Sequence, residues 1–211
     1  MDAAWLSRRA MLACGATFVL APVLAHAESS CSLSGDGEFC TAGVPRGSVE
    51  EFRQLKPHWC WAACIQTIFA THGFAVPQDR IVQRLFGDQT DRSATGPQII
   101  RAIDGRWQGD RGKDFDAKSL LLWDRFNAFE RPDAIALAVR ELSIGNPLIM
   151  ATDRHTLVLT SMTFSEDANG KIAVDSLVVR DPWPTIPNRH PMPIAEIPKS
   201  GFLCGVHVMA A

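Results

Sequence analysis

One cysteine of this 211-residue chain stands where a loop is predicted to turn into an apolar helix. The loop covers residues 54–58, and the apolar run 59–71 is followed by Gly73, a residue typical of a helix end. Cys60 therefore falls in the first turn of the predicted helix. Because the first amides of a helix lack partners and favour negative charge, a thiol there ionises more readily. The segment predicts a nucleophilic cysteine.

Two later apolar runs supply residues that would complete such a site. His155 opens the run His-Thr-Leu-Val-Leu-Thr, and Asp181 closes Ser-Leu-Val-Val-Arg-Asp before a proline. Acyl transfer by a thiol needs a base beside the sulfur, a group that orients the base, and donors for the oxyanion. We interpret Cys60 as the nucleophile, His155 as the base and Asp181 as the orienter. Gln54, six residues before Cys60, is predicted to donate to the oxyanion together with the backbone N–H of Cys60. The pattern predicts a cysteine hydrolase.

Other residues compete for these roles. His72 is excluded as the base, because a rise of about 1.5 Å per residue puts it roughly 18 Å along the helix from Cys60. The remaining histidines considered are His58 beside the nucleophile, His190 in a proline-rich loop, and His207 in an apolar strand that favours a core position. Asp153 and Asp175 are alternatives to Asp181.

The first 27 residues are predicted to be an export signal. They contain Arg8-Arg9, an apolar run over residues 10–24, and Ala25-His26-Ala27 as a cleavage signature. The pattern indicates a bacterial protein sent to the periplasm or the medium by the twin-arginine or the Sec route. No later segment is long and apolar enough to span a membrane. The net charge of −2 gives no reason to expect a nucleic-acid or anionic-membrane partner, and we expect a monomer.

Five cysteines remain after the leader, so at least one stays free or pairs with another chain. If Cys60 is free, the other four cysteines can form two disulfides in three ways. One of these connectivities is Cys31–Cys40 with Cys64–Cys204. Reduced, buried Cys64 and Cys204 are the alternative. The cysteine spacings lack a CxxC pair, and we expect neither a metal nor an organic cofactor.

The pattern of apolar runs and turns predicts an α+β fold. Residues 28–47 are expected to be an irregular segment, and residues 48–211 one domain. Helices are predicted over 59–71, 77–87, 96–105 and 132–144, and strands over 147–152, 155–164, 171–180 and 201–209. Residues 106–118 are polar and contain glycine, and the period of residues 119–129 does not distinguish helix from strand.

Over residues 48–209 the chain resembles the papain-like cysteine peptidases, in the bacterial branch with the AvrRpt2-type and C39-like families. The matching pieces are Gln54 before Trp-Cys60-Trp-Ala-Ala-Cys, then His155-Thr-Leu-Val-Leu, then Val-Val-Arg-Asp181-Pro-Trp. The resemblance implies an N-terminal helical lobe packed on a C-terminal antiparallel sheet lobe, with the site between them. It also implies the four roles assigned above and a peptide or protein substrate.

Two other functions stay open on the sequence. The same residues could serve a cysteine-dependent amidase or transacylase. Alternatively, the chain is an exported binding module without activity, in which Cys60 is packed or disulfide-bonded, His155 is an ordinary turn histidine and Asp181 an Asp-Pro turn residue.

Overall fold

The computed structural model describes residues 29–34, 37–110, 112–167, 172–192 and 201–211. The export signal expected over residues 1–27 lies outside the described residues. The helices are α1 (Cys60–Thr71), α2 (Gln78–Phe86), α3 (Gly96–Ile103) and α4 (Ala134–Ser143), with a short 3₁₀ helix η1 (Arg125–Asn127). The strands are β1 (Ser30–Ser34), β2 (Gly37–Gly43), β3 (Gly105–Gln108), β4 (Asp114–Asp124), β5 (Phe129–Glu130), β6 (Leu148–Ala151), β7 (Thr156–Glu166), β8 (Ile172–Arg180), β9 (Arg189–Met192) and β10 (Phe202–Ala210).

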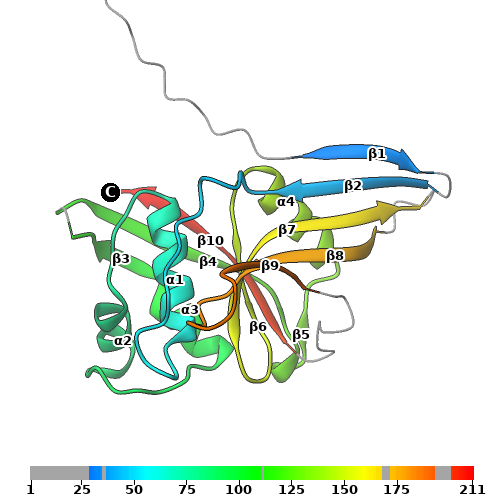
Figure 1. Cartoon of the computed structure of the whole chain (residues 1–211). Helices are drawn as coiled ribbons and strands as arrows, with labels where there is room; N and C mark the ends of the chain where they lie inside the picture. Colours follow the sequence, from blue (N-terminus) through cyan, green and yellow to red (C-terminus); the bar gives the residue numbers. More distant parts are fainter. Residues whose placement is uncertain (1–28, 35–36, 111, 168–171, 193–200) are drawn as a thin grey trace, which may run out of the picture.

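The described strands form one antiparallel sheet, and the predicted α+β fold is confirmed (Figure 1). The main path runs β1-β2-β7-β6-β10-β4-β3, and β8 pairs with both β7 and β9. Strand β7 pairs with three other strands of the sheet. Its first half pairs with β6, its second half pairs with β2, and β8 pairs with β7 along most of the length of β7. The strands that carry His155 and Asp181 are therefore neighbours.

Two hydrophobic cores lie on opposite faces of this sheet. Val158 belongs to the core shared with α1, α2 and α3, whereas Leu157 and Leu159 belong to the core shared with α4. Successive side chains of a strand point to opposite faces, which explains the alternation. Each helix group covers one face (Figure 1). None of the described helices is both long and apolar enough to cross a membrane.

The helices begin and end close to the predicted positions. Helix α2 ends at Gly87, which has a positive φ of 81°, a backbone conformation that glycine adopts without steric cost. Helix α3 begins with a capping box in which Thr95 and Gln98 satisfy each other's backbone N–H groups. Helix α1 is buried over most of its surface, because it packs against β6 and β7 of the sheet and against α2.

The N-terminal segment differs from the prediction. Residues 28–47 were expected to be irregular, but β1 and β2 form a hairpin whose second strand joins β7. Cys31 and Cys40 are directly opposite each other in that hairpin and form a disulfide, as predicted. The pairing with β7 and the disulfide order a serine- and glycine-rich sequence that carries little strand signal of its own.

The predicted Cys64–Cys204 disulfide is wrong. Both thiols are free and buried in the core between the helices and the sheet. The Cys64 thiol donates a hydrogen bond to the carbonyl of Thr156 at 3.3 Å, which directs its sulfur toward β7.

Residues 106–129 also differ from the expectation. Residues 106–118 were described as polar, and residues 119–129 were not assigned to helix or strand. They contain β3 and the long strand β4. The pairing of β4 with β10 shifts register between Leu203 and Cys204, so the alternation of buried and exposed residues changes phase within β4. This irregularity hid the strand period in the sequence.

Candidate active site

Cys60 is the first residue of α1, as the sequence predicted. The start of this helix is held by the indole N–H groups of the two tryptophans that flank Cys60 in the chain. Trp59 donates to the carbonyl of Thr90 at 2.9 Å, and Trp61 donates to that of Arg92 at 3.0 Å. These bonds fix the first turn of α1 against the segment before α3. Both tryptophans are buried, so they position the helix.

His155 lies in the turn between β6 and β7. Its backbone N–H donates to the Thr152 hydroxyl at 3.0 Å, and its carbonyl accepts from the Thr152 N–H at 2.8 Å. Nε2 of the imidazole lies 2.8 Å from Oδ1 of Asp181. The side chain of His155 also interacts with that of Cys60, and this interaction helps to raise the pKa of His155. Since Nε2 faces Asp181, Nδ1 is the nitrogen left for the sulfur.

Asp181 follows the last residue of β8 and is buried. Its backbone is fixed by Asn188, whose carbonyl accepts from the Asp181 N–H at 2.6 Å and whose amide donates to the Asp181 carbonyl at 3.1 Å. Oδ1 accepts a second hydrogen bond, from the Trp183 N–H at 2.7 Å. The Trp183 ring meets the His155 ring edge-on with centroids 6.1 Å apart, so it shields one side of the His155–Asp181 pair.

The three groups shift one another's pKa values toward an ion pair. Burial raises the pKa of the Cys60 thiol, but hydrogen bonds with His155 and Thr156 more than offset this, so the pKa lies below its usual value. Burial alone would lower the pKa of His155, but its bonds to Asp181 and Cys60 raise it to about 9. Burial opposes the ionisation of Asp181, but its bond with His155 lowers its pKa. The arrangement favours a thiolate beside an imidazolium ion.

Gln54 lies in the loop before Cys60 and is buried. Its amide nitrogen donates to the carbonyls of Lys56 at 3.0 Å and Pro57 at 2.8 Å, and Oε1 has no hydrogen-bond partner among the described residues. Its backbone N–H donates to the carbonyl of Pro182 at 2.9 Å, next to Asp181. The structure thus places Gln54 beside the predicted site, with its amide nitrogen held by its own loop.

The other candidates of the sequence analysis lie outside this cluster, with one exception. His58 pairs with Asp91 at 3.2 Å, and His72 ends α1. Asp175 and Asp153 are exposed on the surface. His207 was expected in the core, but its side chain is 47% exposed and pairs with Glu141 at 3.0 Å. The exception is His190, which lies in β9 with Nε2 3.6 Å from Oδ2 of Asp181.

Sequence reasoning placed His190 in a loop and missed Asn188 and Arg53. Arg53 donates to the carbonyls of Trp183 at 2.6 Å and Ile186 at 2.7 Å, which ties the Gln54 loop to the turn after Asp181. The positions of these residues depend on the β8–β9 hairpin. Its short second strand contains Pro191 next to His190, and a proline argues against a strand in a sequence.

A cavity of about 500 Å³ opens beside Cys60 and His155. Its apolar lining comes from Trp61, Ala94, Pro97, Phe126, Ala151 and Phe202. Gly96 lines its wall, and a Cβ atom there would lie 2.6 Å from the Phe202 ring. The cavity therefore offers an apolar surface within reach of the cysteine.

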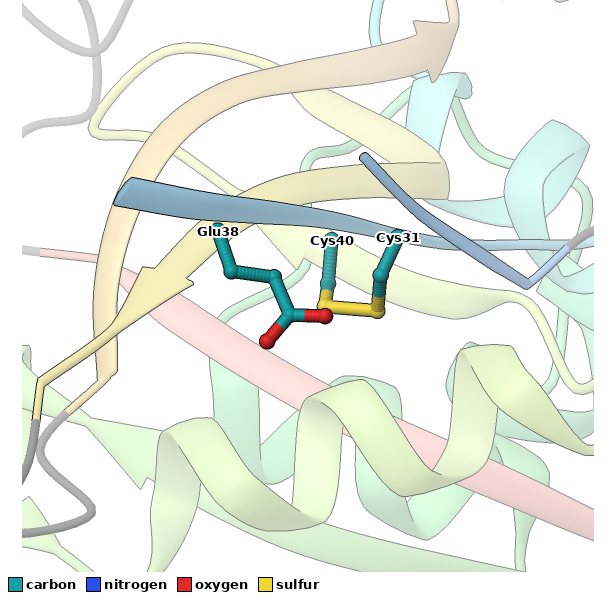
Figure 2. Close-up of side chains that lie close together, drawn as sticks. All are labelled: Cys31, Glu38 and Cys40. Atoms are coloured by element: carbon teal, nitrogen blue, oxygen red, sulfur yellow. A yellow bond between two sulfur atoms is a disulfide. The ribbon is translucent and has the colours of Figure 1, made fainter. Parts of the chain in front are cut away.

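Among the described residues, Cys31, Glu38 and Cys40 come close enough together to hold a metal ion (Figure 2). Both sulfurs are joined in the disulfide, however, and a disulfide sulfur is not the thiolate that metals bind. This group does not fit a metal, and it lies away from Cys60 in the N-terminal hairpin.

No protein-family model matches the chain, and no curated protein resembles it in sequence. Several solved structures resemble it in part, and three of them are described below. A double glycine motif protease from an AMS/PCAT transporter, in complex with the leader peptide, is 16% identical with a TM-score of 0.43, over 81% of this chain and 99% of that chain. The peptidase domain of Streptococcus ComA, a bi-functional ABC transporter involved in a quorum sensing pathway, is 12% identical with a TM-score of 0.43, over 76% and 97%. UfSP from C. elegans is 14% identical with a TM-score of 0.48, over 83% and 33%. Identities and TM-scores this low do not establish a family for this chain.

Proposed function

We propose that this protein is a cysteine peptidase of the papain-like kind that hydrolyses peptide bonds through a thioester on Cys60. The observation that carries the proposal is the line of three side chains in which His155 contacts both Cys60 and the buried carboxylate of Asp181. A free thiol at the start of a helix, with a lowered pKa and an adjacent cavity, is the arrangement that thiol catalysis needs.

The reaction follows from the protonation states of these groups. The Cys60 thiolate attacks the carbonyl carbon of the substrate, and the carbonyl oxygen gains the negative charge. The backbone N–H of Cys60 and the amide of Gln54 are the proposed donors to this oxyanion, and the Gln54 amide must release one of its two loop carbonyls to do so. His155 then gives its proton to the leaving nitrogen, the C–N bond breaks, and the acyl group remains on sulfur.

Hydrolysis of the thioester restores the site. A water molecule loses a proton to His155 as its oxygen attacks the acyl carbon, and the C–S bond breaks to release the carboxylic acid and the thiolate. Throughout both steps Asp181 keeps the imidazole in the orientation that faces the sulfur. The apolar cavity beside Cys60 would take an apolar side chain of the substrate.

We also propose that the protein acts outside the cytoplasm. The Cys31–Cys40 disulfide supports this, because disulfides persist in oxidising compartments. The leader predicted over residues 1–27 agrees with it.

The experiment is digestion of a mixture of peptides by the purified protein, read by mass spectrometry, with Cys60→Ala and Cys204→Ala compared to the wild type. Both variants remove one buried, free thiol, so the second controls for that change. We expect cleavage by the wild type and by Cys204→Ala, and none by Cys60→Ala. Cleavage that survives in Cys60→Ala would contradict the proposal. Adding a primary amine separates transfer from hydrolysis, because a transacylase would join the acyl group to that amine.

A further inference from the structure

The carboxylate of Asp181 lies between two imidazole rings, and the mechanism above uses one of them. His155 stands before β7 and approaches Oδ1 at 2.8 Å, while His190 belongs to β9 and lies with Nε2 3.6 Å from Oδ2. Strand β8, which leads into Asp181, pairs with both β7 and β9. The sheet therefore brings the two histidines to the same carboxylate from opposite sides.

The second carboxylate oxygen of Asp181, Oδ2, faces His190. Oδ1 accepts hydrogen bonds from His155 and from the Trp183 N–H. No hydrogen bond to Oδ2 comes from the residues that the structure describes, and Nε2 of His190 is the charged group that faces it. A buried carboxylate with one oxygen unheld can turn about its bond to the side chain, which would move Oδ1 away from His155.

Both ring nitrogens of His190 lie near oxygen atoms. Nδ1 is 3.0 Å from the carbonyl of Pro191, and Nε2 is buried and faces the Asp181 carboxylate without any closer partner among the described residues. A neutral imidazole has one N–H and one lone pair, so in either tautomer a lone pair would face an oxygen. The imidazolium ion has an N–H on both nitrogens and can present a donor to both oxygens.

Other charged groups around His190 are already engaged. From the loop before α1, Arg53 donates to main-chain carbonyls of the turn after Asp181. From β8, Arg180 binds Glu51 at 2.6 Å and Asn188 at 3.1 Å. Arg189, next to His190 in β9, is exposed. Asp181 is therefore the anion available to His190, and His155 is the nearby like charge.

We propose that His190 is a positioning residue, whose Nε2 faces Oδ2 of Asp181 at 3.6 Å and holds that carboxylate in the orientation that engages His155. This inference rests on the proposed function. It assigns His190 a role through Asp181, without contact to the substrate.

The role has two consequences that can be measured separately. A neutral donor in place of His190 keeps Asp181 oriented, so His155 keeps its partner and the basic limb of the cleavage profile stays near its wild-type position. A side chain without a donor frees Asp181, so His155 loses its partner and releases its proton at lower pH. A merely structural residue would affect the two variants alike.

The experiment measures the rate of peptide cleavage against pH in the wild type, His190→Gln and His190→Ala. His207→Gln is the matched control, since His207 also pairs with a buried carboxylate, that of Glu141. For His190→Gln we expect nearly the wild-type rate at pH 7 and a basic limb close to that of the wild type. For His190→Ala we expect a rate lower by about tenfold and a lowered basic limb. Overlapping profiles for wild type and His190→Ala, or equal losses in both variants, would overturn the proposal.

A second measurement separates this inference from the proposed function. Histidine ¹⁵N NMR is expected to show a different Nε2 signal of His190 in the wild type and in Asp181→Asn, because the substitution removes the carboxylate that faces Nε2. If Cys60 proves unreactive, the proposed function fails, and the NMR comparison still tests the His190–Asp181 contact. A His190 signal that is the same in wild type and Asp181→Asn rules that contact out.

Discussion

Nε2 of His155 lies 2.8 Å from Oδ1 of Asp181, although 26 residues separate the two in the chain. Antiparallel pairing of β7 with β8 produces this contact, because Val158 near the start of β7 is opposite Arg180 at the end of β8. The two side chains are thus held next to each other by the pairing of two neighbouring strands, which agrees with the proposed roles of base and orienter.

Replacing Asp181 by Asn is expected to disable the site without unfolding the protein. The amide is uncharged, so the pKa of His155 should fall from about 9 toward its ordinary 6.5, and the imidazolium would be lost at neutral pH. We expect peptide cleavage at pH 7.5 to fall by about 10²-fold or more. Asp175→Asn, on the exposed face of the same strand, is the control and should keep wild-type activity. Equal activities of the two variants would argue against the role of Asp181.

The cleavage rate should have a bell-shaped dependence on pH. The active form needs Cys60 without its proton and His155 with its proton. On the basic side the rate falls as the pH rises through about 9, where His155 is deprotonated. On the acidic side it falls as Cys60 is protonated, at a pH below the ordinary thiol value of 9.0. A rate that keeps rising above pH 9 would indicate a neutral base and contradict the ion pair.

Replacing Gln54 by Ala should reduce the rate of cleavage but not the reactivity of Cys60. Removing one oxyanion donor typically costs about 10²-fold in turnover. Gln78→Ala is the matched control, because Gln78 holds the same loop through the Leu55 N–H at 3.0 Å and the Arg53 carbonyl at 2.8 Å. If both variants lose activity to the same extent, Gln54 supports the loop and does not bind the oxyanion.

The N-terminal disulfide is expected to support stability and not chemistry. Nine residues separate Cys31 from Cys40, and closing a loop of this length stabilises a protein by roughly 2–3 kcal/mol in the chain-entropy view. Urea unfolding of the variant with both cysteines replaced by Ala should show a loss of this size. The folded variant should cleave peptides at the wild-type rate, since the hairpin contributes no residue to the cavity beside Cys60.

Much of the site could be predicted because its residues are marked by local signals. Cys60 precedes an apolar helix, His155 opens an apolar strand, and Asp181 ends the next one. These signals also located helices α1 to α4 within a few residues. The contact between His155 and Asp181 needs only the further step that consecutive strands pair antiparallel, which is the common case for short connections.

The parts that escaped prediction depend on long-range pairing. The β1–β2 hairpin is ordered by its pairing with β7, and the phase of β4 is changed by its irregular pairing with β10. Cys64 and Cys204 share a core, but the Cys64 thiol is directed to Thr156. His190 reaches Asp181 because of the β8–β9 pairing, which places it opposite Val179. None of these contacts leaves a periodic signal in the sequence.

The most direct test of the central claim is alkylation of the unreduced protein by iodoacetamide as a function of pH, with peptide mapping of Cys60, in the wild type and in His155→Ala. The ion pair predicts rapid labelling of Cys60 well below pH 8 in the wild type, and a profile shifted toward the ordinary thiol range in His155→Ala. Labelling of Cys60 in the wild type that begins only near pH 9, or a profile that the loss of His155 leaves unchanged, would contradict an activated thiolate at this site.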